Sequence, residues 1–146
     1  MAAASIFLMM AGGALRADLA PARAEPNLER RGRLALENAA AQLHAASGAY
    51  AADSWDKAKA ALDEMRDSVD LAYASLQATG KAPRNSSQFK NLEIKTNTLL
   101  MGLRDLLQKM AFEDREQAAP IAARVQQVHD EVLEGVMASP KRKGHR

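Results

Sequence analysis

The sequence contains no cysteine among its 146 residues. Disulfide bonds, thiolate zinc sites, iron–sulfur clusters and covalently attached c-type haem are therefore excluded. Aromatic residues make up only 4% of the chain, and its five prolines and eight glycines are too few for an all-β protein rich in turns. Alanine, the residue with the highest helix propensity, fills about a fifth of the positions. The composition therefore favours an all-α protein.

Neither sign of charge dominates the sequence. It contains 20 Lys and Arg residues and 18 Asp and Glu residues, which gives a net charge of +2. This balance is not typical of a nucleic-acid-binding protein, and no nucleic-acid partner is expected. Several basic residues gather in residues 139–146, which we expect to form a disordered tail. The length indicates one domain, which we place at residues 25–138.

No apolar run reaches the ~20 residues that a membrane-spanning helix needs. An uncharged stretch that includes Ile6, Phe7 and Leu8 runs from Ala2 to Leu15. It is followed by Ala22-Arg23-Ala24, which resembles a signal peptidase site. The pattern predicts a cleavable signal peptide over residues 1–24, a periplasmic or secreted protein, and no stable membrane insertion after cleavage. No basic residue precedes the stretch, which leaves the true start codon open. A short buried or interfacial helix is the alternative.

Apolar residues then recur every three or four positions, the spacing of one face of a helix. One such series is Phe89, Leu92, Thr96, Leu99, Leu103, Leu106 and Met110. The pattern predicts helices over about 27–50, 54–79, 86–110 and 115–137, joined by short links. Short links favour an antiparallel up-down four-helix bundle, in which the first and last helices are neighbours.

Two alternatives to this bundle remain open. The first two predicted helices could form one continuous bent helix, because Gly48 lies near their junction. Two helical hairpins could also bury part of their apolar stripes only when the protein dimerises. A homodimer is therefore one of the partners that the sequence suggests.

Polar and conformationally special residues mark the predicted helix ends. Asn27 is a plausible N-cap for the first helix, and Gly80 follows the end of the second. Asn85, with Gln three residues later, resembles a capping box, and Asp114 has the same signature. Pro120 then falls in the second turn of the last helix, where it would kink or delay that helix.

Two histidines provide a candidate cofactor site. His44 and His129 each follow an apolar stripe residue, so both should flank the core, and neighbouring first and last helices would bring them together. Such a pair can hold haem or a metal ion without cysteine, in an arrangement similar to soluble b-type cytochromes. No cofactor is our main expectation, and haem or metal binding is the alternative. The Glu-x-x-His pairs of di-iron proteins are absent.

Basic residues at one end of the predicted bundle form a candidate interaction surface. They are Lys81, Arg84, Lys90 and Lys95. Such a surface could contact an anionic polymer, lipid headgroups or an acidic partner, although an ordinary solvated helix connection has the same composition.

The stretch from Tyr50 to Met137 resembles small uncharacterised exported helical proteins of soil bacteria. The residues that carry this resemblance are Trp55-Asp56-Lys57-Ala58-Lys59, Gly80-Lys81-Ala82-Pro83-Arg84, Phe89-Lys90 with Glu93, and Asp114-Arg115. The resemblance implies no activity. The chain also lacks recognisable catalytic motifs. We therefore expect a non-enzymatic protein–protein interaction or structural module of the cell envelope. An enzyme without any known motif is a further alternative.

Overall fold

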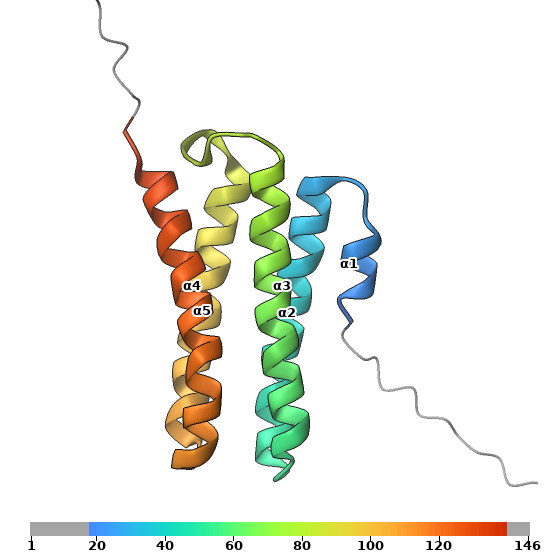
Figure 1. Cartoon of the computed structure of the whole chain (residues 1–146), viewed down its shortest axis with the longest axis vertical. Coiled ribbons are helices and arrows are strands. Elements are labelled where there is room, and N and C mark those ends of the chain that lie inside the picture. Colours follow the sequence, from blue (N-terminus) through green and yellow to red (C-terminus); the bar gives the residue numbers. More distant parts are fainter. Residues whose placement is uncertain (1–17, 140–146) are drawn as a thin grey trace, which may run out of the picture.

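The computed structural model describes residues 18–139, which contain helices and no strands (Figure 1). Its elements are α1 (Ala20–Ala24), α2 (Leu28–Ala51), α3 (Trp55–Ala78), the 3-10 turn η1 (Pro83–Asn85), α4 (Ser87–Lys109) and α5 (Phe112–Met137). The all-α prediction is confirmed, and the four long helices match the predicted ranges to within three residues. Residues 140–146 of the predicted tail lie outside the described residues.

The four long helices form two antiparallel hairpins, α2–α3 and α4–α5, that lie side by side (Figure 1). The main contacts between the hairpins are α2 against α4 and α3 against α5, and each of these pairs is parallel. The predicted contact between the first and last long helices is wrong, because α2 and α5 are not among the closely packed pairs of residues 18–139. The physical reason is the link from α3 to α4. It crosses the end of the molecule through η1, which packs against both α4 and α5.

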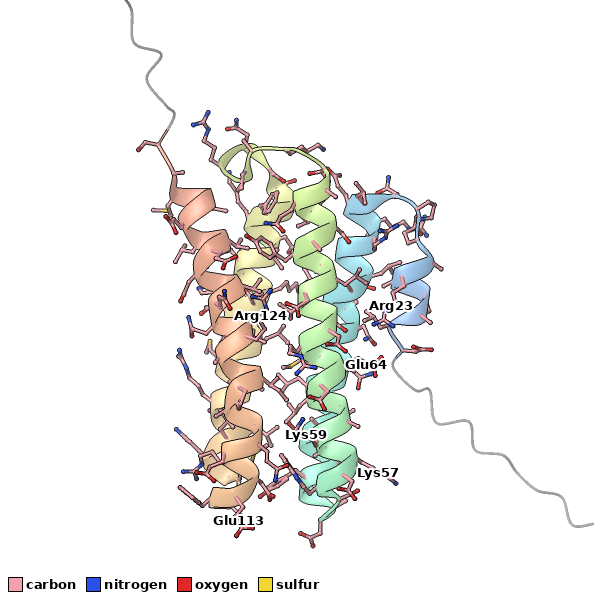
Figure 2. All side chains as sticks on the ribbon, in the orientation of Figure 1. Arg23, Lys57, Lys59, Glu64, Glu113 and Arg124 are labelled. Atoms are coloured by element: carbon pink, nitrogen blue, oxygen red, sulfur yellow. The ribbon has the colours of Figure 1, made fainter. Side chains whose placement is uncertain are left out.

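One apolar core runs through both hairpins. The α2 and α3 helices approach each other most closely, because alanine or glycine occupies many of their buried positions. Longer side chains fill the core between α4 and α5, and examples with 1% exposure or less are Leu92, Leu103, Ile121, Val125, Val128 and Val132. On the α3–α5 side, the Arg124 Nε donates to Asp70 Oδ1 at 2.8 Å (Figure 2).

The helix ends confirm some of the predicted caps and correct others. Asn27 accepts a hydrogen bond from the Arg30 amide, and Gly80 has a φ of 70°, as expected for the residue after a helix. The fourth long helix begins at Phe112, so Asp114 lies in its first turn and Pro120 lies inside the helix.

The start of α4 is also corrected. The N-cap is Ser86, whose hydroxyl accepts from the Phe89 amide, whereas Asn85 belongs to the 3-10 turn. The turn between α2 and α3 is a true break, with Asp53 at a φ of 57°, so the continuous-helix alternative is wrong. Asp is one of the few non-glycine residues that tolerates this conformation.

The short helix α1 lies within the predicted signal peptide, and it packs beside α2 (Figures 1 and 2). Leu19 and Ala22 are each only 2% exposed, and the Leu19 amide donates to Glu64 Oε1 at 2.9 Å. Residues 1–17 of the predicted signal lie outside the described residues, and cleavage after Ala24 stays a prediction. No helix within residues 18–139 is long and apolar enough to cross a membrane.

Candidate functional site

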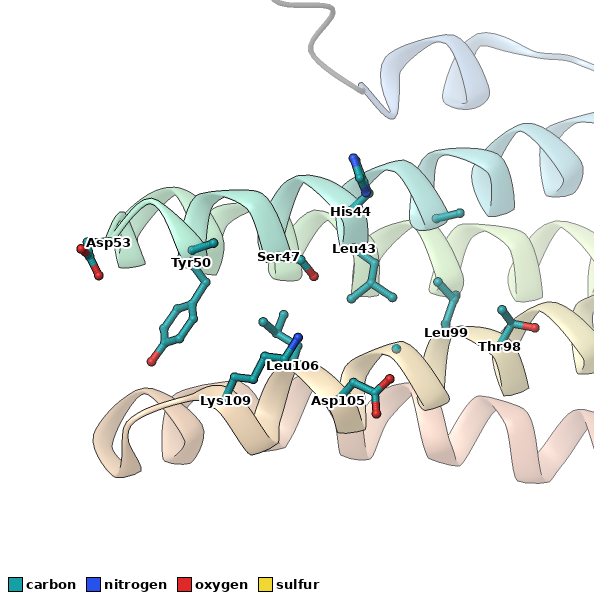
Figure 3. A pocket seen from close by; sticks show the side chains of 13 residues that line it. Leu43, His44, Ser47, Tyr50, Asp53, Thr98, Leu99, Asp105, Leu106 and Lys109 are labelled. Atoms are coloured by element: carbon teal, nitrogen blue, oxygen red, sulfur yellow. The ribbon is translucent and has the colours of Figure 1, made fainter.

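A groove of about 750 Å³ lies between α2 and α4, and we call it the α2–α4 groove (Figure 3). Leu43 on α2 and Leu99 and Leu106 on α4 supply its apolar floor. Its remaining lining residues are Ala40, His44, Ser47, Tyr50, Ala51, Asp53, Thr98, Gly102, Asp105 and Lys109. The helical lining covers residues 40–51 of α2 and 98–109 of α4, each a rise of about 17 Å or three helical turns.

Small residues explain why this groove exists. The wall that α2 provides contains Ala40, Ser47 and Ala51, whose side chains cannot fill the space toward α4. Opposite them, α4 presents Gly102, and a Cβ atom there would lie 2.7 Å from the Leu43 Cδ2. Glycine at this position therefore lets Leu43 sit against α4 while the space beside it stays open.

Tyr50 closes the end of the groove nearest the α4–α5 turn. Its hydroxyl donates to Asp114 Oδ2 at 3.1 Å and accepts from the Ala111 amide at 2.8 Å. Its ring meets Trp55 edge to face, with the centroids 6.1 Å apart. The side chain thus ties the C-terminal end of α2 to the turn of the other hairpin, and Figure 3 shows the phenol reaching across from α2.

Polar side chains line the groove without forming a hydrogen-bonded relay. His44, Ser47 and Asp105 are residue types that serve in nucleophilic catalysis, but no hydrogen bond connects them in the described part of the chain. Figure 3 shows the His44 ring turned away from α4, whereas the side chains of Asp105 and Lys109 come from α4. The polar groups therefore lie along the rim around an apolar floor.

The second predicted histidine lies elsewhere. His129 on α5 is buried at 8% exposure, which corrects the prediction that it only flanks the core. Its Nδ1 lies 3.0 Å from the Thr96 Oγ1, and its Nε2 lies 3.9 Å from a Glu93 carboxylate oxygen. Both partners belong to α4, so His129 helps to join the two helices of its own hairpin.

The structure does not bring His44 and His129 to one site. His44 is exposed on α2, His129 is packed against α4, and α2 and α5 are not a closely packed pair. Within residues 18–139, no three His, Asp or Glu side chains gather in a way that could hold a metal ion. A shared haem or metal site built on these two histidines therefore has no geometric support.

The predicted basic surface is split and partly neutralised. Lys81 forms an ion pair with Glu29, and Arg84 is half-buried in η1. Lys90 lies in the first turn of α4 and Lys95 lies five residues further along that helix, both exposed. A second cavity near this end, of about 330 Å³, is lined in part by Tyr73 and Glu131.

Tyr73 is the one described residue whose ionisation is clearly shifted. Burial raises the pKa of the Tyr73 phenol above its ordinary value, and the neighbouring Glu131 carboxylate raises that pKa further. Both effects disfavour the phenolate form, and they outweigh the positive charge of Arg124, which lowers the pKa.

Sequence reasoning missed the α2–α4 groove. Four of its lining residues stand out in the sequence only as apolar residues at helical spacing, namely Leu43, Tyr50, Leu99 and Leu106. No sequence pattern marks Gly102. Comparisons of the chain with protein-family models, with curated proteins and with solved structures gave no match.

Proposed function

We propose that this protein is a non-enzymatic, exported interaction module, built as a four-helix bundle, that binds an amphipathic helix of another protein in the α2–α4 groove. The observation that carries the proposal is the open groove itself, with three leucines on its floor, small residues on one wall and polar groups on its rim. Helix-in-groove recognition uses this combination, because apolar anchors at positions i, i+3, i+4 and i+7 of the bound helix enter the groove.

The dimensions of the groove support a short helical occupant. Three turns of α2 and three turns of α4 run parallel to each other along it. A bound helix of about 12 residues has the same length, because each residue adds about 1.5 Å along the helix axis. Lys109 on the α4 rim would pair with an acidic residue beside the apolar face of such a helix.

The export part of the proposal is supported by the sequence pattern over residues 1–24, and it places the module in the cell envelope. Expression of the full chain with a C-terminal tag in a bacterial host, followed by mass measurement of the periplasmic fraction, tests it. A periplasmic product that begins at Glu25 is expected, and full-length protein confined to the cytoplasm would contradict export.

A designed peptide that stands in for the natural partner tests groove binding. The probe is a 14-residue amphipathic helix with leucine at the i, i+3, i+4 and i+7 positions, and its control has the same composition with that spacing scrambled. Titration of the purified chain, followed by NMR of leucine methyl groups, should shift the signals of Leu43, Leu99 and Leu106. The scrambled peptide should leave these signals in place.

A pair of matched variants locates the binding site. Ala40→Glu places a carboxylate on the groove wall, whereas Ala45→Glu makes the same change at an exposed position of α2 that does not line the groove. Burying an unpaired charge is costly, so Ala40→Glu should weaken binding of the amphipathic peptide at least about tenfold. Equal effects of the two variants would overturn the proposal, and so would equal binding of the two peptides.

Haem or metal binding is the alternative that the same purified protein tests. An absorption spectrum with a haem band, or a stoichiometric metal content, would contradict the cofactor-free module. Because His44 and His129 do not share a site, a bound group could not take both of them as ligands.

A further inference from the structure

A row of exposed residues on α4, next to the α2–α4 groove, is uncovered in the described part of the chain. The row consists of Lys90, Ile94, Thr98, Met101 and Asp105, spaced by four, four, three and four positions, and so it follows one face of the helix. We call it the α4 stripe. Ile94 is 58% exposed and Met101 is 59% exposed, so the stripe presents two large apolar side chains seven residues apart on one exposed helix face.

Two charges of opposite sign end the α4 stripe. Lys90 is the fourth residue of α4, close to the positive N-terminal end of the helix dipole, and Asp105 is the fifth residue from the C-terminal end. Neither residue forms an ion pair within residues 18–139. Each charge would therefore gain from a neighbour of opposite sign supplied from outside the molecule.

We propose that the partner for this surface is a second copy of the chain, packed with its α4 antiparallel to the first around a two-fold axis. Facing residues of two antiparallel copies of one helix have position numbers with a constant sum, and contacts are reciprocal. With the axis between Asn97 and Thr98, Ile94 faces the partner's Met101. In the same register, Lys90 faces the partner's Asp105. One alignment therefore satisfies both apolar residues and both charges.

The centre of this interface is compatible with close packing. The Thr98 hydroxyl already donates to the Ile94 carbonyl at 3.1 Å, so its burial leaves no unpaired donor. A parallel arrangement fails, because it would set Lys90 against the partner's Lys90 and Asp105 against the partner's Asp105. The order of charges along the α4 stripe thus selects the antiparallel pairing.

This inference deepens the proposed interaction role by naming a second copy as one partner. The two surfaces are adjacent and share only Thr98 and Asp105, which line the groove as well as the stripe. A dimer would carry two α2–α4 grooves, and so it would bind a partner with two suitable helices more tightly than a single groove would.

Charge exchange tests the proposed register. Sedimentation equilibrium of the full chain should show a reversible dimer. Either Lys90→Asp or Asp105→Lys should raise the dissociation constant of this dimer about tenfold, because each substitution creates two repulsive contacts per dimer. The double variant should restore the dimer to within about threefold of the original. This rescue has to act between molecules, because positions 90 and 105 of one helix lie about 22 Å apart.

Matched variants make the test decisive. Lys95→Asp applies the same charge change to an exposed α4 residue outside the stripe and should leave the dimer unchanged, whereas Met101→Ser should dissociate it. Circular dichroism checks that each variant is folded. A monomer at all concentrations, or a double variant as weak as the single ones, would overturn the proposal.

The two proposals fail independently. A monomeric Met101→Ser variant that still binds the amphipathic peptide would support peptide binding in the groove. Its monomeric state would separately support the α4 stripe as the dimer interface. Suppose instead that the single charge variants weaken the dimer and the double variant restores it, but the protein binds no peptide. This result would support the second copy as partner and contradict the helix-binding groove.

Discussion

The α2–α3 and α4–α5 hairpins have helices of nearly equal length but seams of different composition. Many of the buried positions on α2 and α3 are alanines, and the two helices lie close together. The buried positions on α4 and α5 carry mainly Leu, Val and Ile, and these helices make fewer close backbone contacts. The first hairpin therefore depends on the absence of side-chain bulk, and the second depends on its presence.

Small residues on a second, exposed face of α2 account for the α2–α4 groove. A helix with small residues on its buried side can pack tightly against one neighbour, but its flank offers little to fill the space beside a second neighbour. On the α2 flank, Ala40, Ser47 and Ala51 leave the groove open toward α4. Between α3 and α5, by contrast, Val69, Ile121 and Val125 are each no more than 1% exposed. The hairpins thus meet along one filled seam and one incompletely filled seam.

The largest expected effect comes from removing bulk in the α4–α5 hairpin. Leu103 on α4 is 1% exposed, and Leu103→Ala would leave a cavity that its neighbours can only partly fill. We expect a loss of about 3 kcal/mol in the free energy of unfolding, measured by urea denaturation. The matched control is Leu107→Ala, at a half-buried position of the same helix, which should cost less. Equal losses would show that the α4–α5 core is not closely packed.

The sequence predicted the elements of the fold better than their arrangement. Regular apolar spacing identified all four long helices, and the backbone conformations of Gly80 and Asn27 agree with their predicted roles at helix ends. Periodicity shows which face of a helix is buried but not which helix covers it. At the link through η1, Pro83 lies so close to Gly135 that a Cβ atom there would be 3.0 Å from the Pro83 Cγ, and the sequence pattern offers no rule for that contact.

The candidate site was harder to predict for the same reason. The α2–α4 groove exists only because α2 neighbours α4, and the expected order of helices placed α2 beside α5 instead. His129 was expected to flank the core because it follows the stripe residue Val128. It is buried because its ring lies against α4, where its Nδ1 is 3.0 Å from the Thr96 Oγ1. Residue spacing alone cannot show that contact.

Adding bulk in the α2–α3 hairpin should have the next largest effect. Ala39 is fully buried on α2, and Ala39→Leu would force the two helices apart or strain the inserted side chain. We expect a loss of about 2 kcal/mol in unfolding free energy by urea denaturation. Ala41→Leu makes the same change at an exposed α2 position and should be nearly neutral. An unchanged stability for Ala39→Leu would contradict the close approach of α2 and α3.

The smallest effect concerns Tyr50, which links the two hairpins at the closed end of the groove. Tyr50→Phe keeps the ring against Trp55 but removes the hydrogen bonds to Asp114 and to the Ala111 amide. The Ala111 amide is at the surface, so water can replace part of what is lost, and we expect a cost of about 1 kcal/mol. Hydrogen exchange should accelerate most at the Ala111 amide, because it loses its only acceptor in the described structure.

Tyr73→Phe is the control for Tyr50→Phe, because Tyr73 is also half-buried but lies at the other end of the molecule. It should leave exchange at Ala111 unchanged. Equal exchange at Ala111 in both variants would mean that Tyr50 does not hold the α4–α5 turn against α2. The hairpins would then be joined at that end by apolar contact alone. The groove would be free to widen there and to admit a helix with anchor side chains larger than leucine.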